Sequence, residues 1–304
     1  MSNELSIVYS DNYLKFDMGE DNPISRNKTK VFFEKIADRK DIHINKIEAP
    51  RSNEKDVLLV HTQKYLDEVN RAAKEHLELS ADTPMNENTL EAGYYIVGGT
   101  TECLRLALDG KKVINIIGGM HHASSFQASG FCFFNDHAIA IRKLQQDKLI
   151  DKAIIYDLDV HAGQGTQEIF YEDPTVYTVS IHQDPRTIYP WVGFGSQKGS
   201  GAGEGFNLNV TLPPRTKEGT YLEALDDVLN RTSDYPADIK VLLLGVDTLK
   251  DDLLGGLGLE EDSFRKIGER FSKMDKLAIL FGGGYSTKIP DLWIKFIEGY
   301  LGIS

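Results

Sequence analysis

The sequence predicts an α/β fold in which helices cover both faces of a parallel β-sheet. Short apolar runs alternate with segments of helical periodicity along most of the chain, which is the pattern of successive strand–helix units. The chain has 304 residues, of which 41% are hydrophobic, so it can bury a large core. It contains no linker, internal repeat or low-complexity tract. We therefore expect one three-layer domain that spans residues 1–304.

The first part of the chain mixes strands and helices. Its patterns predict strands at residues 6–9 and 42–47, helices at 26–38, 63–73 and 87–108, and a further apolar piece at 57–62. A turn is expected at Asp82-Thr83-Pro84, because the residue before a proline disfavours the helical region. Gly93 and the pair Gly98-Gly99 should interrupt the third helix, and Gly110 should end it.

The second part of the chain is more regular. Strands are predicted at residues 113–117, 153–156, 176–181, 241–246 and 276–281, and helices at 135–146, 217–230, 260–271 and from Pro290 onward. Asn135 can cap the first of these helices, and the glycine-rich segment 193–205 is expected to be a long loop. Ligands of such folds bind beyond the carboxyl ends of the strands, so the residues after each strand are the functional candidates.

Composition limits the partners that the protein can have. The formal net charge is −12 (34 Lys and Arg against 46 Asp and Glu) without a long basic run, which argues against nucleic acid and permits cationic substrates. Cys103 and Cys132 show no pairing pattern and are expected to be free thiols in a reducing compartment. No apolar run approaches the ~18 residues of a membrane span, and no leader segment is evident, so we expect a cytoplasmic protein without a membrane partner.

Three polar residues follow the fourth predicted strand: Asp157, Asp159 and His161. Because side chains alternate along a strand with a period of two, all three can point to the same side. Their burial is costly unless it is compensated, and a divalent metal compensates two carboxylates and an imidazole. Asp247, after the sixth predicted strand, is the best candidate for a third ligand beside Asp159 and His161. Three protein ligands leave one position open, as in catalytic sites.

Two adjacent histidines, His121 and His122, follow the third predicted strand. Amide hydrolysis needs a base to activate water and an acid for the leaving amine, and histidine can serve as both near neutral pH. Asp157 could orient one of the two rings through a carboxylate–imidazole hydrogen bond. We interpret the pair as candidates for acid–base catalysis.

Aromatic residues beside glycines complete the candidate site. Tyr285 follows three glycines, which let the backbone approach a ligand, and its phenol could donate to a developing oxyanion. Gly130-Phe131 and Tyr189-Pro190 offer aromatic faces that could line a narrow channel, although packing in the core is the commoner role of aromatic residues.

Together these motifs resemble the zinc-dependent histone deacetylase and acetylpolyamine amidohydrolase family, which has the arginase/deacetylase fold. Residues 118–123 (GGMHHA) resemble the family's tandem-histidine motif, and residues 130–136 (GFCFFND) its glycine–phenylalanine–cysteine motif. Asp247-Thr248 and the glycine run 282–284 before Tyr285 occur in the family's order. The resemblance covers nearly the whole chain and implies a single domain around an eight-stranded parallel sheet.

The resemblance also implies which residues form each part of the site. The implied catalytic residues are His121, His122, Asp157, Gln164 and Tyr285. The implied zinc ligands, which would also suit Fe²⁺ or Co²⁺, are Asp159, His161 and Asp247. The implied ligands of a structural K⁺ ion are Asp157, Asp159, His161, Ser180 and the backbone of Ile181. The implied tunnel and rim residues are Asp82, Gly130, Phe131, Tyr189 and Leu254.

Within this set, the resemblance implies that His122 is the general base and acid. His121, paired with Asp157, would assist it electrostatically, and Tyr285 would hold the substrate carbonyl opposite the metal. Phe131 and Tyr189 would flank an acyl-lysine side chain, and Asp82 would bind backbone amides of the substrate.

Two departures from the family pattern lie next to the implied base. Ala162 stands where His or Gln is usual, and Gln164 stands where Asp or Asn is usual. Gln164 still offers His122 a carbonyl acceptor, but without a charge it should stabilise an imidazolium less than Asp would.

Further departures concern the channel and the rim. Lys28 stands where an arginine of the inner channel is expected, and Asn22-Pro23 resembles a His-Pro start. Leu253 replaces a usual proline, and Leu254 stands where polyamine-specific relatives carry a glutamate.

Our hypothesis is a metal-dependent amidohydrolase, a deacetylase that removes an acyl group from the ε-amine of lysine in proteins or peptides. Leu254 favours this substrate over an acetylated polyamine, which is the alternative. A second alternative, prompted by Ala162 and Gln164, is a protein that binds acyl-lysine or a small molecule and turns over poorly. The sequence leaves acyl-chain length and oligomeric state open.

Overall fold

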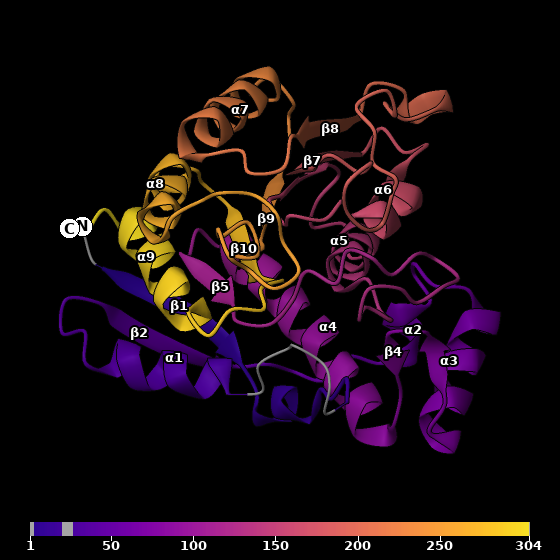
Figure 1. Ribbon diagram of the computed structural model, residues 1–304. Helices are drawn as coiled ribbons and strands as arrows, with labels where there is room; N and C mark the ends of the chain where they lie inside the picture. Colours follow the sequence, from indigo (N-terminus) through magenta and orange to yellow (C-terminus); the bar gives the residue numbers. More distant parts are fainter. Residues whose placement is uncertain (1–2, 20–26, 304) are drawn as a thin grey trace.

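An eight-stranded sheet forms the centre of the molecule (Figure 1). The computed structural model describes residues 3–19 and 27–303. The strand order is β2-β1-β5-β10-β9-β6-β7-β8, and every pairing within it is parallel. The strands are β1 (Glu4–Tyr9), β2 (His43–Glu48), β5 (Val113–Asn115), β6 (Ala153–Asp157), β7 (Val176–Gln183), β8 (Asn207–Leu212), β9 (Ile239–Leu244) and β10 (Leu277–Phe281). The predicted fold class is confirmed.

The strands at the centre of the sheet are buried along their whole length. β5, β6 and β10 contain only buried residues, which is why their sequences read as continuous apolar runs. The edge strand β8 was not predicted, because polar residues alternate with apolar ones in it. The Asn207 and Asn209 side chains both donate to the Gln167 side-chain oxygen, at 3.1 and 2.7 Å, so the polar positions of β8 are bonded inside the protein.

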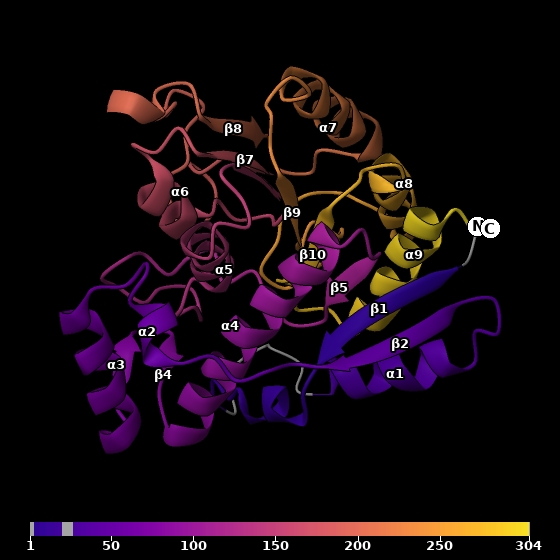
Figure 2. The same ribbon diagram turned by 180° about the vertical axis from the view of Figure 1, so that it is seen from behind.

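Helices cover both faces of the sheet, as Figures 1 and 2 show from opposite sides. One face carries α4, α5 and α6, and the other carries α1, α7, α8 and α9, as right-handed crossovers between parallel strands require. The helices are α1 (Lys28–Ala37), α2 (Glu54–Val57), α3 (Gln63–Glu75), α4 (Glu87–Leu108), α5 (Asp136–Gln146), α6 (Gln164–Phe170), α7 (Glu218–Arg231), α8 (Glu261–Phe271) and α9 (Ile289–Leu301). Within the described residues, none of them combines the length and apolar character needed to cross a membrane.

Short elements connect these layers. A small antiparallel hairpin joins β3 (Glu78–Ser80) to β4 (Thr83–Pro84), so the predicted turn at Asp82 lies within a hairpin. The short 3₁₀ segments are η1 (Asp11–Lys15) and η2 (Gly201–Gly203), the second of which lies in the predicted glycine-rich loop. Cys103 and Cys132 are buried free thiols. Asn22-Pro23, which resembles a His-Pro start, and the predicted helix start at residue 26 lie outside the described residues.

The prediction that glycines interrupt α4 is wrong, because the helix runs unbroken from Glu87 to Leu108. The glycines instead allow close packing. A Cβ atom at Gly98 would lie 1.9 Å from the Pro50 carbonyl oxygen, and one at Gly99 would lie 1.8 Å from the Tyr13 hydroxyl. Tertiary contact therefore outweighs the low helix propensity of glycine here.

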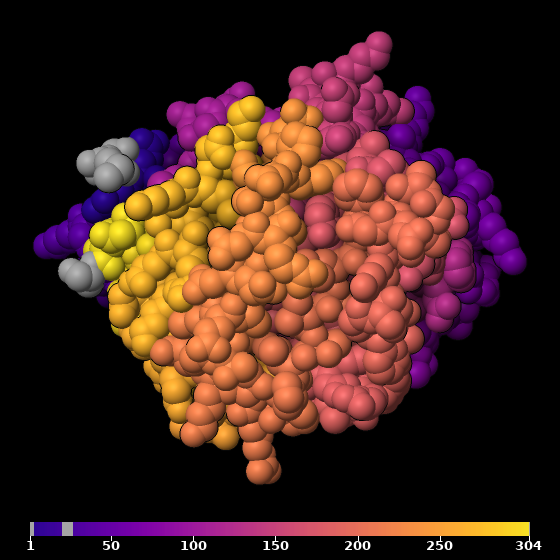
Figure 3. All heavy atoms as spheres, turned by 90° about the horizontal axis from the view of Figure 1, so that it is seen from above, coloured from indigo at the N-terminus to yellow at the C-terminus, as the bar shows by residue number. Residues whose placement is uncertain are grey.

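The chain reverses its direction across the sheet, and this reversal positions the site. From β5 it proceeds through β6 and β7 to the edge strand β8, and it returns through β9 to β10. The carboxyl ends of β5, β10, β9 and β6 thus lie side by side, where ligands of open α/β sheets bind. Most of the surface seen from above belongs to this second half of the chain (Figure 3).

Candidate active site

Asp159, His161 and Asp247 converge at the carboxyl ends of β6 and β9. All three residues are buried, and one potential ligand atom from each lies within 4.8 Å of the others. His161 Nδ1 is 2.9 Å from Asp159 Oδ1 and 3.4 Å from Asp247 Oδ2. Asp247 Oδ1 accepts a hydrogen bond from the Val160 backbone at 3.0 Å, whereas its Oδ2 is buried without a hydrogen-bond partner among the described residues.

The electrostatics of this cluster fit a divalent cation. Burial, reinforced by the Asp159 carboxylate, raises the pKa of Asp247. A cation between the two carboxylates would relieve both effects. The absence of a side chain at Gly283 leaves room beside the two carboxylates, because a Cβ atom there would lie 2.2 Å from Asp159 Oδ2 and 2.6 Å from Asp247 Oδ2. Two carboxylates and one imidazole form a donor set that binds zinc or a similar ion.

A loop, and not the alternation of a strand, brings these side chains together. β6 ends at Asp157, so the strand alternation assumed in the prediction is wrong for Asp159 and His161, although Asp157 and Asp159 both face His121, at 2.7 and 3.8 Å. The Asp159 backbone N–H donates to Asp157 Oδ1 at 3.1 Å, and the His161 backbone N–H donates to Asp159 Oδ1 at 2.9 Å. These side-chain bonds to the backbone two residues ahead fold the loop and direct Asp157 toward His121.

The two histidines form a hydrogen-bonded chain beside the cluster. His121 Nδ1 lies 2.7 Å from Asp157 Oδ2, and the Nε2 atoms of the two rings are 3.1 Å apart. His122 Nδ1 lies 2.6 Å from Gln164 Oε1. The predicted partners Asp157 and Gln164 are thus in contact with His121 and His122, respectively.

The neighbours of the two rings give them different proton affinities. Burial alone would lower the pKa of His121, but the carboxylates of Asp157 and Asp159 outweigh it and raise the pKa to about 9. Burial, followed by the positive charges of His121 and His161, lowers the pKa of His122. His122 is therefore the ring that is held neutral and able to accept a proton.

Asp136 holds the loop that carries the histidines. It is fully buried and accepts hydrogen bonds from the backbone of Met120 at 2.7 Å and of Gly119 at 3.0 Å, and from the Thr100 hydroxyl at 2.6 Å. The sequence analysis gave Asp136 no role of its own, and the predicted helix cap is made by Asn135, whose side chain accepts from the Ala138 backbone. Its place in the GFCFFND motif was the signal that could have identified it.

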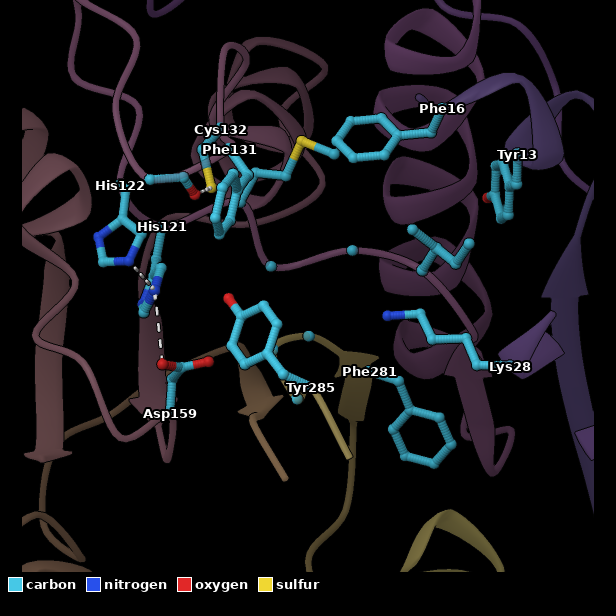
Figure 4. A pocket seen from close by; sticks show the side chains of 18 of the residues that line it. Tyr13, Phe16, Lys28, His121, His122, Phe131, Cys132, Asp159, Phe281 and Tyr285 are labelled. Atoms are coloured by element: carbon cyan, nitrogen blue, oxygen red, sulfur yellow. Dashed lines mark hydrogen bonds and ion pairs between the residues drawn. The ribbon is translucent and has the colours of Figure 1, made fainter. Parts of the chain in front are cut away.

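Tyr285 lines a cavity of about 110 Å³ together with both histidines and Asp159. Figure 4 shows the Tyr285 hydroxyl on the side of the ring that faces the histidines, while Lys28 of α1 points into the cavity from the opposite side. Burial, then the charges of Asp247 and Asp159, raises the pKa of Tyr285, so the phenol keeps its proton. The Tyr285 backbone N–H donates to Asp252 Oδ2 at 2.9 Å, a contact that the sequence analysis missed.

Glycine and aromatic residues form the wall beside His122. A Cβ atom at Gly130 (φ +54°) would lie 2.3 Å from His122 Cδ2, so this position requires glycine. Phe131, with φ +66°, packs its ring 6.1 Å from that of Tyr285. The Tyr189 ring lies edge-on to His122 at 5.1 Å. The structure thus places Gly130, Phe131 and Tyr189 around the catalytic candidates.

The two predicted rim residues lie in different surroundings. Asp82 accepts a hydrogen bond from the Gly130 backbone at 3.2 Å, so it adjoins the wall. Leu254 is exposed and does not line the cavity, but its backbone N–H donates to Asp252 Oδ1 at 3.0 Å. Asp252 therefore connects the Leu254 loop to Tyr285.

The predicted potassium ligands come from β6, the loop that follows it, and the neighbouring strand β7. Asp157 of β6 is directly opposite Ser180 of β7, and Ile181 follows. Ser180 Oγ is 2.7 Å from His182 Nδ1. The register places Asp157 beside Ser180, and a K⁺ ion held by this set stays a prediction.

Comparison with known proteins agrees with this architecture. Residues 22–299 match the family described as the histone deacetylase domain. The acetoin utilization protein AcuC of Bacillus subtilis (strain 168) is 28% identical over 309 residues, which cover 95% of this chain and 80% of that protein. Acetylpolyamine amidohydrolase 2 of Pseudomonas aeruginosa is 36% identical over 187 residues, which cover 60% of this chain and 54% of that protein.

A solved structure of a histone deacetylase homologue has a similar fold. The crystal structure of a histone deacetylase homologue from Aquifex aeolicus superimposes with a TM-score of 0.89 at 26% identity, and the match covers 99% of this chain and 85% of that one. The chain belongs to the histone deacetylase family, and the predicted family is confirmed. It is a hydrolytic deacetylase of that family.

Proposed function

We propose that this deacetylase hydrolyses the amide bond between an acyl group and the ε-amine of lysine in proteins or peptides. The observation that carries this proposal is the continuous hydrogen-bonded chain from Asp157 through His121 and His122 to Gln164, directly beside a buried cluster suited to a metal. Such a chain holds one imidazole neutral next to a group that stays charged, as acid–base catalysis requires.

The metal would be bound by Asp159, His161 and Asp247, which suit Zn²⁺ and also accept Fe²⁺ or Co²⁺. When bound, Zn²⁺ supplies a Lewis acid for the substrate carbonyl and lowers the pKa of water. A structural K⁺ ion at Asp157, Asp159, His161, Ser180 and the Ile181 carbonyl would stiffen the same loop.

The protein's own groups would move the proton and stabilise the developing charge. His122 accepts the proton of the attacking water at Nε2 and later donates it to the departing amine. His121, held by Asp157, contributes a positive charge beside the reaction. Tyr285, whose phenol stays protonated, donates to the carbonyl oxygen as negative charge develops there.

The wall and rim would select the substrate. Phe131 and Tyr189 flank the approach to His122 and would enclose the aliphatic part of an acylated lysine. Asp82, at the Gly130 backbone, would accept hydrogen bonds from the amides of a peptide. Leu254 leaves the rim without the acidic group that would attract a polyamine.

Two substitutions test these roles. His122→Ala should lower kcat by about 10²- to 10⁴-fold, the usual contribution of general acid–base catalysis. Tyr285→Phe should lower it by roughly 10²- to 10³-fold through loss of one oxyanion donor. Hydrolysis of an acetyl-lysine peptide by metal-loaded enzyme measures both, with circular dichroism to confirm folding. His76→Ala, at an exposed histidine, is the control. Near-normal turnover in either active-site variant would reject the assigned role.

Acetylpolyamine hydrolysis is the second candidate function. The 36% identity to acetylpolyamine amidohydrolase 2 and the net charge of −12 favour it. The deciding experiment compares kcat/KM for acetyl-lysine and longer acyl-lysine peptides with that for acetylputrescine and acetylspermidine. A preference for the peptides supports our proposal, and a preference for the polyamines replaces it with this alternative.

A further inference from the structure

Gln164 joins the catalytic base to the wall of the substrate site. Its Oε1 lies 2.6 Å from His122 Nδ1, while its Nε2 donates to Ser129 Oγ at 3.3 Å and to the Tyr189 hydroxyl at 3.4 Å. The Ser129 and Tyr189 hydroxyls are also hydrogen-bonded to each other. A single amide therefore contacts His122 at one end and a pair of hydroxyls at the other.

The orientation of this amide is coupled to the position of the proton on His122. With Oε1 toward the ring, Nδ1 must carry the proton, and Nε2 is left as an acceptor. With the amide reversed, its N–H would face Nδ1, and the proton would have to sit on Nε2. Only the first arrangement leaves Nε2 unprotonated and able to accept a proton; this atom also lies 3.1 Å from His121 Nε2.

The hydroxyl pair favours the first arrangement. One of its two O–H protons is used in the bond between Ser129 and Tyr189, so the pair offers two acceptor oxygens but only one further donor. The amino end of Gln164 has two N–H protons and lies near both oxygens. Glutamine also has more rotatable bonds than aspartate or asparagine. The Gln164 amide can therefore hold one orientation toward His122 only if its amino group, Nε2, is also bonded.

We propose that Ser129 and Tyr189 are positioning residues, which fix the Gln164 amide and thereby, together with the contact between the two Nε2 atoms, hold His122 in the tautomer with an unprotonated Nε2. This inference rests on the proposed role of His122 as the base. It gives the Tyr189 hydroxyl a task distinct from that of its ring, which lies edge-on to His122. Neither residue touches the reacting atoms in this role.

Tyr189→Phe tests the proposal, because it keeps the ring and removes the hydroxyl. We expect kcat to fall about tenfold, at the lower end of the effect of groups that orient a ligand or catalyst, with KM and the affinity for a hydroxamate little changed. Ser129→Ala should act in the same direction and serves if the first variant folds poorly. Tyr235→Phe is the matched control, because that hydroxyl bonds the Pro174 carbonyl, away from these residues.

A double-mutant cycle separates positioning from substrate contact. If the hydroxyl acts through Gln164, Tyr189→Phe should have no further effect on kcat in the Gln164→Ala background. An equal loss of kcat in both backgrounds, or a change confined to KM, would overturn the proposal.

Nitrogen-15 NMR of the histidine rings provides a readout that does not depend on turnover. The unsubstituted protein should show His122 protonated at Nδ1, and Tyr189→Phe should shift part of the population to protonation at Nε2. An unchanged tautomer in both hydroxyl variants would contradict the proposal. This spectrum also distinguishes failure of the positioning role from failure of the proposed function. It reports the tautomer of His122 even if no acyl amide is hydrolysed.

Discussion

The floor of the site and its rim are built in different ways. The floor residues His121, His122, Asp159, His161 and Asp247 are at most 6% exposed. Hydrogen bonds from the backbone fix the carboxylates, as at Asp159 and Asp247. On the rim, Leu254 is 38% exposed, and the wall is assembled from loops that are distant in sequence.

This difference separates chemistry from selectivity. A buried carboxylate or imidazole has few alternative partners, so a change in the floor alters charge and proton transfer at once. A residue on the rim is screened by water, so a change there should alter which substrate is preferred by only a small factor. Four predictions test how sharp this division is.

The largest effect is expected at Asp247. Asp247→Asn keeps the acceptor for the Val160 backbone but removes a carboxylate from the metal cluster, so turnover should fall by more than about 10³-fold. Without metal, the same variant should unfold at a higher temperature, because a buried charge and its repulsion from the Asp159 carboxylate are gone.

Two measurements check this prediction. Metal content after gel filtration should fall in Asp247→Asn, and calorimetry with and without chelator should show opposite orders of stability for the variant and the unsubstituted protein. Retention of a full metal equivalent with normal turnover would show that Asp247 is not a ligand.

The same division explains what the sequence could predict. The floor follows short apolar strands at known offsets, so Asp159, His161 and Asp247 were identified from the residues themselves. The rim has no periodic pattern: Phe131 and Tyr189 were suggested only as aromatic residues beside a glycine and a proline, and the role of Asp82 came only from the family resemblance. The contacts of Asp136, Asp252 and Ser129 were missed, because each depends on loops that meet only in the folded chain.

The second prediction concerns Asp252, which links the two regions. Its two carboxylate oxygens accept the backbone N–H groups of Leu254 and Tyr285. Asp252→Asn supplies only one acceptor, so we expect kcat to fall roughly tenfold, as for other orienting groups, with less change in KM. The effect should largely disappear in the Tyr285→Phe background. Equal losses in both backgrounds would mean that Asp252 does not act through Tyr285.

The third prediction concerns Lys28 in the inner cavity. Burial lowers the pKa of Lys28 to about 8, so below that pH the folded protein holds a poorly solvated charge. Lys28→Met should therefore stabilise the fold by about 1 kcal/mol, or a few degrees in Tm.

The sign of the pH dependence follows from proton binding. Between about pH 8 and the ordinary lysine pKa, the unfolded chain binds a proton that the folded chain has lost, so stability rises with pH in the unsubstituted protein. The gain in the free energy of unfolding from Lys28→Met should thus be largest below pH 8 and should shrink above it. Denaturant titrations across this range measure it, and Lys30→Met, at an exposed lysine, is the control. A pH-independent difference would contradict the assignment to Lys28.

The smallest effect is expected at the rim itself. Leu254→Glu adds a negative charge at an exposed position, where the attraction of a cationic substrate is worth at most about 1 kcal/mol. The ratio of kcat/KM for acetylputrescine to that for an acetyl-lysine peptide should therefore rise by only a few-fold, and the gain should vanish at high salt. Leu149→Glu, at an exposed leucine between α5 and β6, should leave the ratio unchanged. A gain of a hundredfold, or one that resists salt, would show that residue 254 contacts the substrate in a desolvated pocket. Residue 254 would then belong to the floor of the site and not to its rim.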